Sequence, residues 1–189
     1  MHTLFSIEPD LPEGFTYAPD FLNVDEELGL HEEILKLELH NMRFHGYEAK
    51  RKTASFGYDY SFENGNLTKG KDIPPAFNSI VLKVAKHLAI APDQFAELLV
   101  TEYPVGAVIN WHRDAPPFDI IVGISIMADC IFRLRPQNRE LQTRASKISL
   151  AVKRRSLYVI QGSARSKWQH STQPVKEVRY SITLRTLRK

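Results

Sequence analysis

A chain of 189 residues with 43% apolar residues falls in the size range of one domain, which we expect to span residues 1–189. The composition excludes a disordered protein, and no run approaches the roughly 20 apolar residues of a membrane span. A single cysteine excludes a disulfide framework or a thiolate metal cluster, and the N-terminus lacks a signal-peptide pattern. We therefore expect a cytoplasmic monomer that does not bind membranes.

The net charge is only +3, but cations gather in residues 50–52, 133–139 and 153–155. Such clusters are typical of proteins that bind a polyanion. Each cluster taken alone fits a solvated charged face equally well.

The N-terminal third predicts an arm and a helix. The first twenty residues are proline-rich and weakly periodic, so we expect them to lie on the body of the domain. Asn23 can cap a helix that runs to about His40, with Glu26 placed to complete a capping box. The predicted apolar stripe consists of Leu28, Ile34, Leu35 and Leu39.

Residues 43–62 carry aromatic and basic side chains in short extended runs and end in a turn signal at 63–66, which predicts a hairpin or flap. A second helix is expected after Pro74 and Pro75 and should stop near Pro92. Its predicted apolar face consists of Phe77, Ile80, Val81, Val84 and Leu88.

The chain after Phe95 is rich in strands. Six are expected, at residues 98–103, 120–127, 131–135, 148–151, 157–161 and 178–188. Two helices followed by six short strands indicate an α+β protein whose core is a β-sandwich or jelly roll, with both helices packed on one side of a sheet.

His112 and Asp114 follow a predicted strand at a spacing of two, and His170 lies far downstream beside other predicted strands. A histidine, a carboxylate and a remote histidine form the facial triad of non-haem Fe(II) oxygenases, which leaves three coordination positions open. Two can accept a chelating cosubstrate and the third dioxygen. Zinc can occupy the same ligands, and a His-x-Asp pair also arises by chance.

The last predicted strand has two faces of different character. Tyr180, Ile182 and Leu184 share one face, while Arg179, Ser181, Thr183 and Arg185 share the other. If the polar face points into the sandwich, its arginines need an anion, and each can form a bidentate pair with a carboxylate of a small dianion. The alternative is an exposed edge strand whose charges block aggregation.

The order and spacing of these residues make the pattern specific for one family. The pattern consists of a Tyr-Pro-Val-Gly segment at 103–106, His112 and Asp114, then His170, then Arg179 and Arg185. From about the first helix to Arg185, the chain resembles the AlkB family of Fe(II)/2-oxoglutarate dioxygenases. The resemblance implies a double-stranded β-helix (jelly-roll) core with N-terminal supporting helices and a substrate lid at about 43–66. It also implies Fe(II), 2-oxoglutarate and dioxygen.

The resemblance further implies that Arg179, helped by Tyr103 and Ser181, binds the distal carboxylate of 2-oxoglutarate. Arg185 is then expected near Asp114 and the carboxylate beside the iron. Members of the family often carry asparagine where this chain has Thr101, so the hydrogen bond of that asparagine is in question here.

The expected substrate residues are Arg51, Phe56, Tyr58 and Tyr60, all in the lid. Aromatic rings can stack on a base turned out of its helix, and cations can hold the flanking phosphates. The alternative is an aromatic hairpin packed on the core.

The function that this resemblance implies is oxidative dealkylation of N-alkylated nucleobases in DNA or RNA, as in repair of alkylation damage. No catalytic residue beyond the metal ligands is expected. Two alternatives are a 2-oxoglutarate-dependent hydroxylase or demethylase acting on a protein or a small molecule, and a nucleic-acid-binding module with a vestigial metal site.

Overall fold

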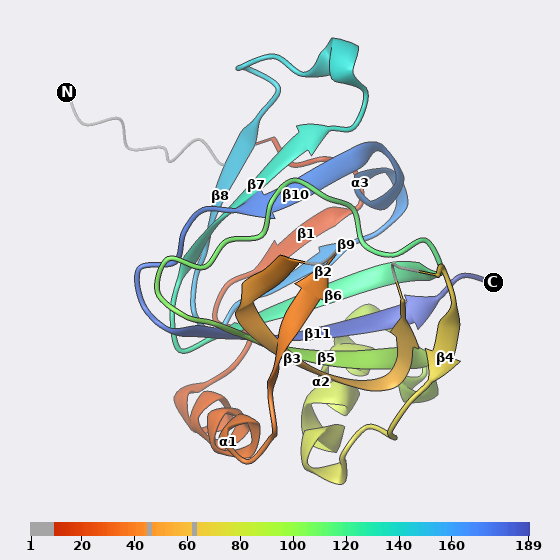
Figure 1. Cartoon of the computed structure of the whole chain (residues 1–189), viewed down its shortest axis with the longest axis vertical. Helices are drawn as coiled ribbons and strands as arrows, with labels where there is room; N and C mark the ends of the chain where they lie inside the picture. Colours follow the sequence, from red (N-terminus) through yellow and green to blue (C-terminus); the bar gives the residue numbers. More distant parts are fainter. Residues whose placement is uncertain (1–9, 45–46, 62–63) are drawn as a thin grey trace.

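Two antiparallel sheets form the framework of the protein (Figure 1), seen in a computed structural model that describes residues 10–44, 47–61 and 64–189. The larger sheet has the order β1-β9-β6-β11-β5-β3-β2, with β4 paired to β3, and the smaller has the order β10-β7-β8. The strands of the larger sheet are β1 (Phe15–Ala18), β2 (His40–Phe44), β3 (Tyr47–Tyr60), β4 (Leu67–Lys69), β5 (Phe95–Tyr103), β6 (Phe118–Ile126), β9 (Leu157–Ile160) and β11 (Arg179–Leu187). Those of the smaller sheet are β7 (Cys130–Pro136), β8 (Ile148–Val152) and β10 (Trp168–Thr172).

Helices α1 (Val24–Leu35) and α2 (Asn78–Leu88) cover one face of the larger sheet (Figure 1). A short helix, α3 (Gly162–Lys167), leads into β10. The single-turn 3-10 helices are η1 (Pro75–Phe77), η2 (Pro92–Gln94) and η3 (Arg139–Leu141). In the described residues, no helix is long and apolar enough to cross a membrane.

The apolar core has two parts, one on each face of the larger sheet. The first joins the two helices to the sheet through residues such as Ile34, Val84 and Ile182. The second lies between the two sheets and includes Phe118, Phe132 and Ile160. This arrangement is the expected jelly-roll core with helices on one side, and the α+β prediction is confirmed.

The first helix begins as predicted but ends early. Asn23 and Glu26 exchange both hydrogen bonds of the capping box at 2.8 Å. The helix stops at Leu35 rather than near His40, where β2 begins. The predicted stripe was also partly wrong, because Leu28 and Leu35 are exposed. The buried face is formed by Glu27, Leu30 and Ile34, which a count of apolar residues alone does not find.

Glu27 is a fully buried carboxylate that ties α1 to the β6–β7 and β8–β9 turns. It accepts a hydrogen bond from the Met127 backbone amide at 2.8 Å and pairs with Arg154 at 2.6 Å. We expect Glu27→Ala to lower the free energy of unfolding by about 1.5–3 kcal/mol, because the Met127 amide and Arg154 both lose a hydrogen bond to this carboxylate. Denaturant unfolding measures the loss. Glu32→Ala, on the exposed side of the same helix, should change stability little, and equal effects would contradict this account.

The second helix is confirmed but ends at Leu88, four residues before Pro92, and all six predicted strands are confirmed with ends shifted by up to three residues. Strands β1, β2, β3, β4 and β10 were not predicted individually. Part of the N-terminal arm does lie on the domain, but as β1, paired antiparallel with β9. The flap is a hairpin as expected, yet β3 also pairs with β5, so the lid grows directly from the larger sheet. Residues 45–46 and 62–63 of the lid lie outside the described residues.

Candidate metal centre

Two histidines far apart in sequence are joined through their backbones. The amide of His112 donates to the carbonyl of His170 at 3.0 Å, and the reverse bond is 2.9 Å. The β5–β6 loop therefore runs beside β10 like a further strand of the smaller sheet, as Figure 1 shows. This pairing places both imidazoles on the inner side, with ring centroids 4.2 Å apart.

The side chains of His112, Asp114 and His170 form a compact set of ligands, whose donor atoms lie within 4.8 Å of one another. Nδ1 of His112 is 2.8 Å from the Asn110 carbonyl, so this nitrogen donates its proton and Nε2 keeps its lone pair for a metal. Oδ2 of Asp114 is buried without a hydrogen-bond partner among the described residues and lies 3.4 Å from Nε2 of His170. A buried carboxylate oxygen without a donor, between two imidazoles, fits a divalent cation.

Asp114 remains ionised although it is buried. Burial raises its pKa, but Arg185 and then the two histidines outweigh this effect and hold the pKa well below its usual range. Arg185 donates to Oδ1 from Nε at 3.1 Å and from Nη2 at 2.7 Å. These bonds occupy one oxygen and orient the other toward the histidines.

His170 is held as a neutral ligand. Burial, followed by the neighbouring His112, lowers its pKa to about 3. The ring of Phe132 stacks against it at a centroid distance of 5.3 Å. A neutral imidazole is the form that binds a metal, so this nitrogen does not have to lose a proton first at ordinary pH.

The lowered pKa of His170 predicts how the metal-free protein responds to acid. An unfolded histidine titrates near 6.5, so between pH 6.5 and about 3 the unfolded state binds a proton that the folded state excludes. Stability should therefore fall as the pH decreases through 6.5, by up to about 1.4 kcal/mol per pH unit. Urea unfolding of chelator-treated protein between pH 4.5 and 7 measures this slope. His170→Asn should reduce the slope. An unchanged slope would show that a group other than His170 takes up the proton on unfolding.

Arg179 is a buried cation on β11 that lines the same pocket as the three metal ligands. Its side chain is only 2% exposed, Nε donates to Ser125 Oγ at 2.8 Å, and its guanidinium carbon lies 5.0 Å from the centre of the Tyr103 ring. Within the described part of the chain, no carboxylate forms an ion pair with it. Because a buried charge is costly unless it is paired, Arg179 calls for an anionic ligand.

Arg185 is not placed to act as the second arginine of a clamp for a dianion. Besides Asp114 it pairs with Glu97, which is 3% exposed and also accepts from Ser55 at 3.2 Å. Two carboxylates thus already balance its charge. Sequence reasoning missed Glu97 and Ser125. For Glu97 a signal existed, because alternation along β5 puts it on the same face as Thr101 and Tyr103.

A cleft of about 1440 Å³ contains the triad and opens between the sheets. Tyr103, Arg179 and Arg185 line it, as does Thr101. Ser181 is buried and pairs in register with Thr101, but it does not line the cleft. Apolar walls are formed by Leu99, Phe118, Ile121, Phe132 and Ile160.

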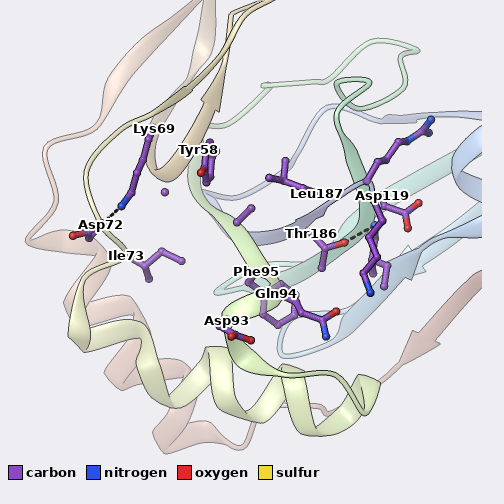
Figure 2. Close-up of a pocket in the computed structure, with 15 residues that line it drawn as sticks. Tyr58, Lys69, Asp72, Ile73, Asp93, Gln94, Phe95, Asp119, Thr186 and Leu187 are labelled. Atoms are coloured by element: carbon purple, nitrogen blue, oxygen red, sulfur yellow. Dashed lines mark hydrogen bonds and ion pairs between the residues drawn. The ribbon is translucent and has the colours of Figure 1, made fainter.

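The four expected substrate residues are not all brought to this cleft. Arg51 and Tyr60 line it, and burial lowers the pKa of Arg51. Phe56 borders it but packs against the helix-side core. Tyr58 lies instead in a separate recess of about 960 Å³ between β4 and the ends of β5 and β11, where Figure 2 shows it near Lys69. Strand β3 pairs with β5 as far as Gly57, whose φ is positive at 85°, and pairs with β4 from Tyr58 onward.

Comparison with known proteins agrees with this geometry. The model of the 2OG-Fe(II) oxygenase superfamily matches residues 14–185. The chain therefore belongs to this superfamily, whose members are Fe(II)- and 2-oxoglutarate-dependent dioxygenases that use dioxygen. Within it, the chain is AlkB-like.

Two curated relatives support the second step. The chain is 27% identical over 176 residues to mouse tRNA (carboxymethyluridine(34)-5-O)-methyltransferase ALKBH8, covering 88% of this chain and 25% of that protein. It is 25% identical over 192 residues to the Arabidopsis thaliana alkylated DNA repair protein ALKBH8 homolog, covering 89% of this chain and 53% of that protein. The chain thus spans between a quarter and about half of the length of these relatives.

Solved structures share the fold. OsALKBH1 has a TM-score of 0.67 at 14% identity, over 93% of this chain and 99% of that chain. A Trichoplax adhaerens prolyl hydroxylase in complex with a hypoxia inducible factor peptide fragment has a TM-score of 0.64 at 16% identity, over 92% of this chain and 83% of that chain.

Proposed function

We propose that this protein removes alkyl groups from nucleobases in DNA or RNA by Fe(II)- and 2-oxoglutarate-dependent oxidation. The observation that carries the proposal is the rim of the cleft: the lid hairpin borders the triad with Lys50, Arg51 and Tyr60. Cations and an aromatic ring beside an oxidising centre suit a flipped base and its phosphates. The names of the relatives, a tRNA-modifying enzyme and a DNA repair protein, favour the same substrate class.

In this proposal His112, Asp114 and His170 hold the iron, which when bound supplies oxygen transfer from dioxygen to a C–H bond as 2-oxoglutarate becomes succinate and carbon dioxide. Arg179 and Tyr103 hold the distal carboxylate of the cosubstrate, with Ser181 supporting them from beneath. Arg185 orients Asp114. The apolar walls exclude water, so that these charges interact strongly. The hydroxylated alkyl carbon leaves as an aldehyde, and the base nitrogen recovers its proton.

Mass spectrometry of methylated oligonucleotides tests this function. DNA and RNA carrying N-methylated bases are incubated with protein, Fe(II), 2-oxoglutarate and ascorbate. We expect one oligonucleotide class to lose the mass of one methylene group per methylated base, with formaldehyde and succinate formed in equal amounts. Omitting 2-oxoglutarate is the control. Succinate formation without mass loss from any oligonucleotide would contradict the nucleic-acid assignment while leaving the oxygenase intact.

A further inference from the structure

Two of the basic clusters of the sequence differ in how the fold compensates their charge. In residues 153–155, Lys153 pairs with Asp129 at 2.9 Å and Arg154 with Glu27 at 2.6 Å, while Arg155 lies 3.6 Å from Asp20. This cluster is therefore neutralised within the fold and holds α1 against the β8–β9 turn. Its cations are structural.

The cluster that starts at Arg133 is uncompensated. Residues 133–147 contain five basic side chains and one acidic side chain, Glu140, whereas the whole chain carries a net charge of only +3. Within the described ranges, none of the five forms an ion pair. All five lie on β7 or in its connection to β8: they are Arg133, Arg135, Arg139, Arg144 and Lys147.

Two of these cations lie on the outer face of the smaller sheet, and the other three lie in the connection that follows it. Along β7 the burial alternates, so Phe132 and Leu134 point into the core while Arg133 and Arg135 point outward. Arg139 and Arg144 are exposed beyond the end of β7, in the connection to β8 that projects from the body of the protein in Figure 1. The charge therefore runs from the sheet to the end of the hairpin.

An aromatic ring fixes this charge next to the metal centre. The guanidinium carbons of Arg135 and Arg133 lie 4.4 Å and 5.1 Å from the centre of the Trp111 ring, and Nε of Arg135 donates to Gln169 at 2.8 Å. Trp111 precedes the ligand His112 and lines the cleft. Held by the ring, Arg135 loses little side-chain entropy when it binds an anion.

We propose that this basic face binds the phosphates of the polynucleotide strand that carries the target base, outside the cleft itself. It consists of Trp111, Arg133, Arg135, Arg139, Arg144 and Lys147. The proposal rests on the proposed function and extends it by giving the flanking strand a path away from the lid. A row of uncompensated cations beside an aromatic ring complements a polyanion, and spaced single charges match successive phosphates better than one small ligand.

Salt-dependent binding tests the proposal. The probe is a fluorescein-labelled, unmodified single-stranded oligonucleotide, as DNA and as RNA, titrated with the full chain and followed by anisotropy at several salt concentrations. Each phosphate contact contributes about 0.7 to the slope of log affinity against log salt. We expect Arg139→Gln/Arg144→Gln to reduce this slope by about 1.4. Arg135→Gln should reduce it by about 0.7.

Lys86→Gln is the matched control, because it removes the same single charge from the exposed side of α2. It should leave the slope unchanged. The two test variants alter different parts of the face. If Arg135→Gln does not fold, the double variant Arg139→Gln/Arg144→Gln, whose positions are exposed, still tests the proposal. The proposal would be overturned if the salt slope of the double hairpin variant equalled that of the wild type. It would also be overturned if the wild type bound no oligonucleotide.

A protein partner gives a different result: binding of an acidic peptide that the variants weaken, without binding of the oligonucleotide. That result would also overturn the proposal. The proposed function fails separately, when the wild type releases no methyl group from any oligonucleotide. Wild-type demethylation with unchanged salt slopes in the variants therefore rejects this inference alone.

Discussion

Replacing His112 with alanine is expected to abolish 2-oxoglutarate turnover. The substitution removes one of the three metal ligands, and the remaining Asp114 and His170 cannot hold the metal in a facial arrangement. Changes to groups that merely support a metal ligand cost roughly 10–100-fold, so loss of a ligand should exceed about 100-fold in succinate formation. Succinate released per enzyme, measured by mass spectrometry at saturating 2-oxoglutarate, is the readout.

The matched control is His87→Ala, an exposed histidine on α2 that faces away from the cleft. It should retain full turnover. The His112 variant should also lose the thermal stabilisation that Mn(II), a redox-stable probe, gives the wild type, while its melting temperature without metal stays close to that of the wild type. Full turnover by His112→Ala would refute the site.

Patterns with strong local causes were predictable from the sequence. The capping box at Asn23 and Glu26 and the proline-led start of α2 are set by neighbouring residues, and the structure has both. The period-two alternation of β11 correctly separated Ile182 and Leu184 from Arg179 and Arg185. One face of this strand packs against the helix-side core, and the other lines the cleft.

What sequence reasoning missed depends on contacts between distant segments. Glu27 has no apolar character, and only Arg154 and the Met127 amide make its burial possible. Tyr58 and Tyr60 look equivalent in sequence, but they line different pockets in the part of β3 that pairs with β4. Likewise, Arg179 and Arg185 look like a symmetric pair until Glu97 is seen beside only one of them. Such partners belong to tertiary structure and leave little trace in local pattern.

This asymmetry between the arginines gives the second large prediction, for Arg179→Met. We expect the variant to lose binding of 2-oxoglutarate, because truncating one partner of a buried charge pair costs roughly 2–5 kcal/mol, or about 30-fold to several thousandfold in affinity. The Michaelis constant for 2-oxoglutarate measures the loss. Arg179→Lys should restore only part of the affinity, since an ammonium group cannot form the bidentate pair.

Thermal unfolding separates this role from a structural one. With saturating Mn(II) present, 2-oxoglutarate at 100 times its dissociation constant should stabilise the wild type by about 2.7 kcal/mol, which for a chain of this size raises the melting temperature by roughly 5–11 °C. Arg179→Met should show no such rise. Because Arg179 is buried without an anionic partner in the described residues, an apolar side chain of similar length should not lower the melting temperature of the cosubstrate-free protein. A variant that melts much earlier yet still gains stability from 2-oxoglutarate would show that this arginine supports the fold and that another group holds the cosubstrate.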